Sequence, residues 1–223
     1  MAKGASKVYA AVRTLSTAQP LLVGQSANLV VPLYLDLSKP ESIVRAAQEA
    51  TDVEIVINNA GILSYTTPMA DDAVQQLQRE MDINVYGFMN VAQAFAPILK
   101  ANGGGVLCQI NSVGSLRCPL TSVSTYAASK AAAYSMTQAL RASLKEQNTY
   151  VMSVHPGPIK TDMIAGRGDL TKFTVELPEV VAKEVILSME AGDFLCFPDE
   201  LSKSLSRAYQ PFSDYVFEQG KIY

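Results

Sequence analysis

Two residues with complementary proton chemistry, Tyr126 and Lys130, lie four positions apart. In a helix this spacing places both side chains on one face, one turn apart. A phenol ordinarily has a pKa near ~10, too high for ready proton exchange at neutral pH, and a neighbouring ammonium lowers that pKa. The pair therefore predicts a tyrosine that acts as a general acid or base. Taken alone, the spacing is more typical of a surface tyrosine beside a solvated lysine, so the prediction depends on other residues.

Further polar residues follow apolar segments of the chain. Ser112 comes just after the apolar segment 106–110, where its hydroxyl could polarise a substrate carbonyl. The segment 58–61 (NNAG) ends another apolar stretch, Asn84 follows it, and 155–161 (HPGPIKT) ends a third. These placements favour a functional reading of the Tyr–Lys pair.

Taken together, these motifs resemble the short-chain dehydrogenase/reductase family. The shared motifs are NNAG at 58–61, the helix with Asn84, INS ending at Ser112, YAASK at 126–130 and PGPIKT at 156–161. Their order and spacing match the family across nearly the whole chain. The resemblance implies an oxidoreductase that transfers a hydride between a nicotinamide coenzyme and a small carbonyl or secondary alcohol substrate.

The resemblance assigns four catalytic roles. Tyr126 would pass a proton to or from the carbonyl oxygen, and Ser112 would hold the same oxygen, as in an oxyanion hole. Lys130 would bind the nicotinamide ribose and lower the pKa of Tyr126. Asn84 would hold a water that links Lys130 to solvent, although an asparagine inside a bent helix could also simply satisfy backbone groups.

The resemblance also implies coenzyme contacts by Tyr126, Lys130 and residues that follow strand ends. The latter are Asn59, Ala60 and Gly61 under the adenosine ribose, Pro156, Gly157 and Ile159 around the nicotinamide, Thr161 at its amide or the pyrophosphate, and Asp36 with Leu37 at the adenine. For Asp36 and Thr161 a helix-capping role is an open alternative.

Arg13 bears on the choice of coenzyme. It follows the segment 8–12, which resembles the family strand whose end meets the adenosine 2′ position. Members that prefer NAD usually place a carboxylate there, whereas a guanidinium suits a phosphate. We therefore expect NADP(H) to be favoured over NAD(H), the alternative being a solvated arginine at a strand end.

The elements that must position these residues alternate along the chain. Apolar runs predict strands at 8–12, 29–35, 53–58, 106–110, 150–155 and 194–197. Amphipathic stretches predict helices at 41–50, 71–100 (one helix or two), 125–147, 178–190 and 201–209. This order predicts a Rossmann-like α/β fold, a doubly wound parallel sheet with helices on both faces. Ligands of such sheets bind beyond the carboxyl ends of the strands, where the candidate residues lie.

Composition narrows the function classes. The 223 residues carry a net charge of −3 without a basic run, which argues against nucleic acid as the main ligand. Three cysteines without a CxxC spacing predict neither a disulfide framework nor a metal site. No segment suits a signal peptide or a membrane span. We expect a single domain over residues 1–223 in the cytoplasm, and the resemblance implies a homodimer or homotetramer.

The sequence has no counterpart of the family's first strand and TGxxxGxG loop, which normally bind the pyrophosphate. That strand normally lies between those at 8–12 and 53–58, so we expect two unpaired strand edges there or a closed gap. One hypothesis is that the chain is N-terminally truncated relative to a working enzyme. The alternative is a non-catalytic regulatory or interaction protein on the same fold.

Two segments, 113–122 and 162–177, are expected to wall the substrate pocket. His155, the only histidine of the chain, is not expected to serve Ser112 as a catalytic base. It lies in a predicted strand, and the chain has no G-x-S-x-G nucleophile elbow.

Overall fold

The computed structural model describes residues 4–24, 27–165 and 174–217. Strands and helices alternate as predicted. The strands are β1 (Val8–Val12), β2 (Val30–Tyr34), β3 (Ile55–Asn58), β4 (Gly105–Ile110), β5 (Thr149–Val154) and β6 (Leu195–Cys196). The α-helices are α1 (Pro40–Glu49), α2 (Ala73–Met81), α3 (Phe88–Ala101), α4 (Ser124–Ser143), α5 (Pro178–Ala191) and α6 (Glu200–Phe217).

Shorter helical turns join these elements. They are the 3₁₀ segments Leu15–Leu22, Ala27–Leu29, Val113–Ser115 and Lys145–Gln147, and a π-helical turn over Asp82–Gly87. The sequence did not predict the first of these, because Leu15–Leu22 has no helical periodicity and contains Pro20. The predicted helix 71–100 is two helices, joined without a break by the π turn.

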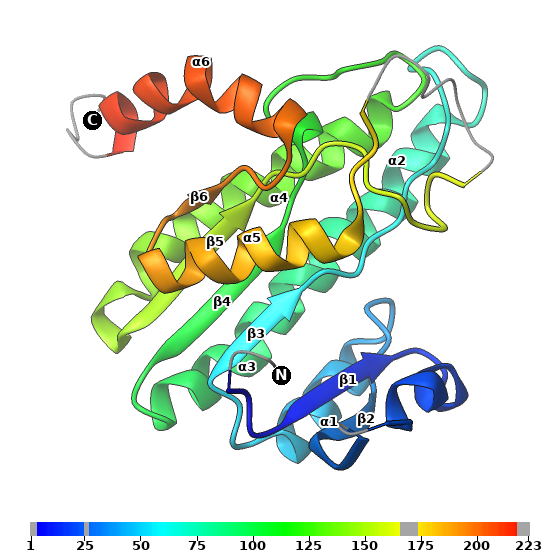
Figure 1. Ribbon diagram of the computed structural model, residues 1–223. Helices are drawn as coiled ribbons and strands as arrows, with labels where there is room; N and C mark the ends of the chain where they lie inside the picture. Colours follow the sequence, from blue (N-terminus) through cyan, green and yellow to red (C-terminus); the bar gives the residue numbers. More distant parts are fainter. Residues whose placement is uncertain (1–3, 25–26, 166–173, 218–223) are drawn as a thin grey trace.

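The strands form two parallel sheets that share no ladder within the described residues. One has the order β1-β2, and the other has the order β3-β4-β5-β6 (Figure 1). The parallel α/β fold is thereby confirmed. The sequence left two possibilities for β1 and β3, either two unpaired edges or a closed gap. The structure has the unpaired edges, because in the described part of the chain β1 pairs only with β2 and β3 pairs only with β4.

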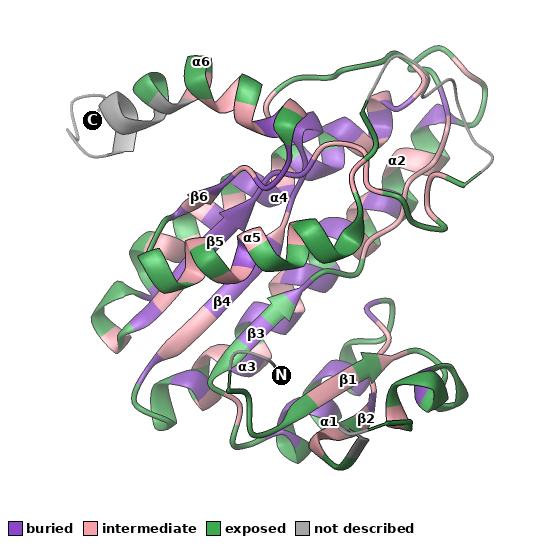
Figure 2. Ribbon diagram, in the orientation of Figure 1, coloured by how far each residue is buried: buried purple, intermediate pink, exposed green. Residues whose placement is uncertain are grey.

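Helices cover the larger sheet unequally. In Figure 1, α5 crosses the front of this sheet while α3 and α4 lie behind it. The core behind the sheet includes Phe88, Leu99 and Leu107, and the smaller core in front joins Met152 to Val185 of α5. Both faces of β4 and β5 are thus largely covered, as Figure 2 shows by their purple colour.

The helices on the two faces of the sheet do not cover both faces of β3. Its exposure alternates, with Val56 and Asn58 buried but Ile55 and Ile57 each about half exposed. Only one face of β3 packs against the core, and α5 lies over the other strands (Figure 2). A short apolar run therefore predicted the strand but not its surroundings.

Residues 4–24, 27–165 and 174–217 contain neither a membrane-spanning helix nor a cluster of metal ligands. None of their helices is both long and apolar enough to cross a bilayer. These residues also contain no cluster of three or more His, Cys, Asp or Glu side chains suited to a metal ion.

Candidate active site

Ser112 and Tyr126 meet beyond the carboxyl end of β4. Ser112 caps the short turn that follows this strand, where its Oγ accepts a hydrogen bond from the amide of Gly114 at 3.0 Å. Tyr126 lies in the first turn of α4 and shares a hydrogen bond with the Ser112 side chain. Two hydroxyls from separate elements are thus presented at one point of the sheet edge.

Lys130 lies one turn further along α4, on the same face as Tyr126. Its Nζ donates a hydrogen bond to the carbonyl oxygen of Ile110 at 2.7 Å and lies 5.8 Å from the centroid of the Tyr126 ring. The side chain is buried, and burial lowers the pKa of Lys130 to about 8. The site therefore holds an ammonium that is poorly solvated and easily deprotonated.

The pKa of Tyr126 is set mainly by burial, and the expected lowering of this pKa by Lys130 stays a prediction. Burial raises the pKa of Tyr126 to about 12, and the hydrogen bond with Ser112 offsets only part of that increase. The nearby Glu80 adds to the increase because a carboxylate disfavours a second negative charge. The Lys130 ammonium donates to the carbonyl of Ile110 and lies over the Tyr126 ring, 5.8 Å from its centroid.

Asn84 lies within the π-helical turn between α2 and α3. Its Oδ1 accepts from the amide of Ile62 at 2.8 Å, and its Nδ2 donates to the Ile62 carbonyl and to the Oγ of Ser129, both at 2.9 Å. The Ser129 hydroxyl in turn donates to the carbonyl of Tyr126. Asn84 thus satisfies backbone groups, but those of the loop after β3 and not those of its own helix. It joins that loop to the first turns of α4.

Gly61 brings the loop after β3 against the other site residues. A Cβ on this residue would lie 3.0 Å from the Oδ1 of Asn84 and 3.6 Å from the Nζ of Lys130. Contacts of 3.0 Å are tighter than nearly all real Cβ contacts, so a side chain here would displace the asparagine or the backbone. Of the predicted coenzyme residues in this loop, Gly61 therefore converges with the Tyr–Lys pair, whereas Asn59 and Ala60 are exposed.

The segment after β5 lies beside the Ser112 turn. Pro156 is buried, and its carbonyl accepts from the amide of Val113 at 3.0 Å. The amide of Gly157 donates to Oδ2 of Asp199 at 2.8 Å, and a Cβ on Gly157 would lie 2.8 Å from Oδ1 of the same carboxylate. A side chain at position 157 would therefore displace the carboxylate of Asp199.

The rest of that segment is less enclosed. Ile159 forms an isolated parallel bridge with Glu176, and the exposed Thr161 donates to the carbonyl of Ile159 at 3.2 Å. This bond closes a local turn, so Thr161 caps no helix in the described structure.

Arg13 and Asp36 lie at the carboxyl ends of β1 and β2, in the other sheet. Asp36 accepts two hydrogen bonds from Ser38, which hold the pKa of the carboxyl below its usual value, with a smaller contribution from the Arg13 charge. These bonds close a local turn before α1, whose N-cap is Lys39 without a side-chain cap bond, so Asp36 does not cap that helix. Leu37 is buried, and its Cβ would lie 2.9 Å from a Cβ on Gly87 in the π turn.

Sequence reasoning missed two serines that organise the site. Ser129 links Asn84 to Tyr126, and it could have been noticed as the residue before the lysine of YAASK. Ser115 contacts both the main chain of Ser112 and the ring of His155. No local pattern pointed to this second contact, because its partners lie about 40 positions apart.

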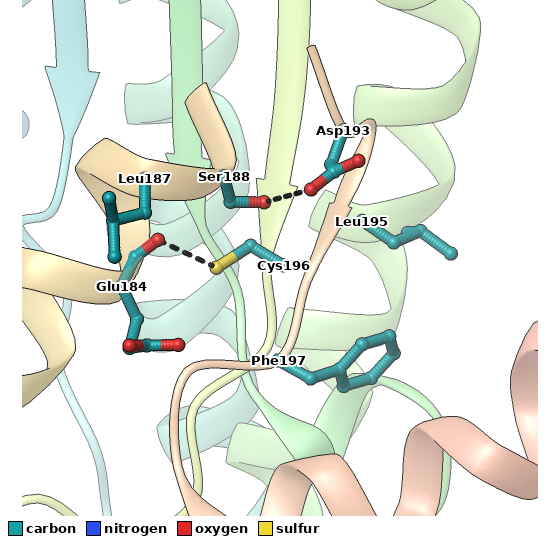
Figure 3. Close-up of a pocket in the computed structure, with 7 residues that line it drawn as sticks. All are labelled: Glu184, Leu187, Ser188, Asp193, Leu195, Cys196 and Phe197. Carbon is teal, nitrogen blue, oxygen red and sulfur yellow. Dashed lines mark hydrogen bonds between the residues drawn. The ribbon is translucent and has the colours of Figure 1, made fainter. Parts of the chain in front are cut away.

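A separate hollow between α5 and β6 contains none of the predicted site residues (Figure 3). It is lined by Glu184, Leu187, Ser188, Asp193, Leu195, Cys196 and Phe197. Ser188 donates to the carboxylate of Asp193 at 3.1 Å at the start of β6, the amino end of the strand. The hollow therefore does not belong to the site at the carboxyl ends.

Comparison with known proteins gives a consistent result. Residues 1–170 match a protein family described as short chain dehydrogenase. A 3alpha-hydroxysteroid dehydrogenase of Mediterraneibacter gnavus is 34% identical over 150 residues, which cover 67% of this chain and 55% of that protein. The chain thus spans about half the length of this curated relative.

Solved structures agree at the level of the fold. A short chain dehydrogenase from Burkholderia cenocepacia in complex with NADP superposes with a TM-score of 0.83 at 29% identity, covering 98% of this chain and 87% of that one. A 3-ketoacyl-(acyl-carrier-protein) reductase from Brucella melitensis complexed with NADH gives a TM-score of 0.77 at 22% identity, covering 87% and 86%. The family match spans most of the chain and coincides with the grouping of Ser112, Tyr126 and Lys130, so this protein belongs to the short-chain dehydrogenase/reductase family.

Proposed function

We propose that this protein transfers a hydride between NADP(H) and a small carbonyl or secondary alcohol substrate. The observation that carries the proposal is the convergence of Ser112, Tyr126 and Lys130 beyond β4, against a glycine at position 61. A hydroxyl pair beside a buried ammonium suits the polarisation and protonation of a carbonyl oxygen.

The residues present fit the nicotinamide and ribose end of the coenzyme. Gly61 leaves its backbone open beside Lys130, whose buried ammonium can donate to ribose hydroxyls. Pro156 and Gly157 border the same edge of the sheet. The family's TGxxxGxG loop for the pyrophosphate has no counterpart in the sequence, so we propose weak coenzyme binding by the chain alone.

Arg13 supports NADP(H) as the preferred coenzyme. It is exposed at the end of β1, where a guanidinium could pair with a 2′-phosphate. Related structures contain either coenzyme, since the Burkholderia protein was solved with NADP and the Brucella protein with NADH. The preference therefore rests on this arginine.

Tyr126 is the proposed general acid and base. A bound nicotinamide would supply or accept the hydride. The pKa of about 12 keeps the Tyr126 phenol protonated at neutral pH, which is the state that donates a proton to a carbonyl oxygen. Ser112 would donate a hydrogen bond to that oxygen, while Asn84 holds the loop after β3 in place beside Lys130.

The substrate pocket is proposed between the segments 113–122 and 162–177, of which residues 166–173 lie outside the described structure. The relative from Mediterraneibacter gnavus is named for a hydroxysteroid, so ketosteroids belong among the candidate substrates. We further propose a homodimer or homotetramer in the cytoplasm. The free thiols of Cys108, Cys118 and Cys196 suit a reducing compartment.

Consumption of NADPH and NADH in the presence of diones, aldehydes and ketosteroids tests the proposal. Two forms are assayed, the chain itself and a form with a family-type strand, TGxxxGxG loop and helix added before Met1. Turnover in either form that is lost in Tyr126→Phe, but kept in Tyr86→Phe at an exposed tyrosine, supports it. No turnover in both forms, or equal turnover in Tyr126→Phe, contradicts it.

A further inference from the structure

His155 is a buried residue with no part in the proton transfer described above. It directly follows β5, has no solvent exposure, and its ring packs edge-on to Tyr134 at a centroid distance of 4.6 Å. On the other side it stacks on Phe197 at 5.3 Å and an interplanar angle of 23°. In Figure 3 the sulfur of Cys196 points toward Glu184, whereas the ring of the next residue, Phe197, points to the opposite side. The imidazole of His155 thus packs between the rings of Tyr134 and Phe197, and these contacts fix the orientation of the imidazole plane.

Both ring nitrogens of His155 are hydrogen-bonded, and their partners define the tautomer. Nδ1 lies 3.2 Å from the carbonyl oxygen of Ser112, which can only accept, so Nδ1 carries the hydrogen. Nδ1 also lies 2.9 Å from the Oγ of Ser115, whose own hydrogen is donated to the same Ser112 carbonyl. Nε2 is then the acceptor and receives the Ser153 hydroxyl at 2.8 Å, while Asn111 donates to Ser153.

These bonds form a directed chain from Asn111 through Ser153, His155 and Ser115 to the main chain of Ser112. Every donor in the chain faces an acceptor, which holds for only one of the two neutral tautomers. Burial, the largest effect, and the nearby charge of Lys130 lower the pKa of His155 to about 4. The neutral ring required by this chain is therefore the stable form at neutral pH.

We infer that His155 is a positioning residue for Ser112. Its Nδ1–H, acting directly and through Ser115, fixes the carbonyl at which the Ser112–Ser115 turn begins. The inference rests on the proposed function for its kinetic consequence. It differs from a catalytic triad because the ring faces the main-chain oxygen of Ser112 and not the hydroxyl.

The Ser112–Ser115 turn links the contact made by His155 to the position of the Ser112 hydroxyl. The Ser112 hydroxyl accepts from the Gly114 amide, and the Ser115 amide donates to the Ser112 carbonyl. If that carbonyl rotates, the Oγ moves with it relative to Tyr126. Displacement of a reacting group by about 1 Å can cost on the order of 10²-fold in rate. Loss of the His155 donor should therefore lower kcat and leave coenzyme binding unchanged.

Asparagine and glutamine at position 155 form a matched pair for the test. The asparagine amide nitrogen occupies the place of Nδ1 and keeps the donor, whereas the glutamine amide reaches the place of Nε2 and does not. We expect kcat to fall at least about 10-fold in His155→Gln and within about 3-fold in His155→Asn, with unchanged coenzyme Kd in both. Ser115→Ala keeps the imidazole, and its kcat should lie between those of the two position-155 variants. It replaces them in the test if a position-155 variant does not fold.

A readout without turnover separates this inference from the proposed function. Because His155 is the only histidine, ¹⁵N-histidine labelling of the chain with its purification tag removed gives one imidazole signal pair. We expect the Nδ1–H tautomer at neutral pH, and Gly114 amide exchange that is faster in His155→Gln than in His155→Asn. The Nε2–H tautomer, or equal exchange in the two variants, overturns the inference. If these results hold while the wild type shows no turnover, the proposed function fails and the positioning of Ser112 stands.

Discussion

The ammonium of Lys130 donates to the carbonyl oxygen of Ile110, the last residue of β4, across 2.7 Å. This bond fixes the charge at the sheet edge but leaves it poorly solvated, as its pKa of about 8 indicates. A buried charge of this kind destabilises the folded chain, since the unfolded state hydrates the same ammonium fully.

Lys130→Met should therefore stabilise the ligand-free protein at neutral pH. The folded pKa of about 8 lies below the ordinary 10.5, so at pH 7 the lysine is charged in both states and the penalty is on the order of 3 kcal/mol. Part of it is offset by the lost bond to Ile110. As pH rises above 8 the folded state releases its proton first, wild-type stability rises, and the advantage of the variant shrinks.

Urea unfolding of both proteins at pH 7 and pH 9 measures this difference. Lys100→Met, at an exposed position of α3, serves as the control and should show no such trend. An advantage of Lys130→Met that is the same at both pH values would contradict the burial of a charged lysine.

Tyr126→Phe should lower turnover by roughly 10²–10⁴, the usual size of a general acid contribution. Ser112→Ala should also act on kcat, because it removes a hydrogen bond to the reacting oxygen. Steady-state kinetics with the best substrate found, in whichever form turns over, measure both. Near-normal kcat in Tyr126→Phe would reject the acid–base assignment.

Arg13→Ala should weaken NADPH binding by about 1.5–3 kcal/mol, the range for hydrogen bonds to charged groups, and leave NADH binding nearly unchanged. Titration calorimetry with both coenzymes gives the two affinities. Arg45→Ala, an exposed arginine on α1, should affect neither. Equal losses for NADPH and NADH would show that Arg13 does not read the 2′-phosphate.

Asn84→Ala should destabilise the fold by about 1–3 kcal/mol, because the partly buried amide and carbonyl of Ile62 lose their partners. For a chain of this length the melting temperature should fall by roughly 2–4 °C per kcal/mol. Gln93→Ala, at an exposed position of α3, is the matched control. A melting temperature equal to that of the control would mean that the Ile62 loop is held by other contacts.

The chain alone should be stabilised only slightly by NADPH, and the form with the added strand and loop much more. A ligand at 100 times its Kd stabilises by about 2.7 kcal/mol. Melting curves of both forms with and without NADPH provide the measurement. Strong stabilisation of the chain alone would mean that another segment binds the pyrophosphate.

The sequence predicted the strand and helix order because apolar runs and amphipathic stretches differ clearly in length and period. It also placed Ser112, Tyr126 and Lys130 at one edge, since parallel strands bring their carboxyl ends together. It could not predict the raised pKa of Tyr126 or the half-exposed Ile55 and Ile57, which depend on packing between distant segments. The contact of His155 with the Ser112 turn is missed for the same reason.

The π-helical turn over Asp82–Gly87 has a consequence for changes in chain length. A π turn holds one residue more than an α-helical turn in the same place. Deleting one residue here would convert the π turn into an α turn and leave α2 and α3 in nearly the same relative orientation, but side chains within the turn would shift, and Asn84 would lose its contact with Ile62. Insertions and deletions should therefore be tolerated in the exposed loops of this protein but not within these six positions.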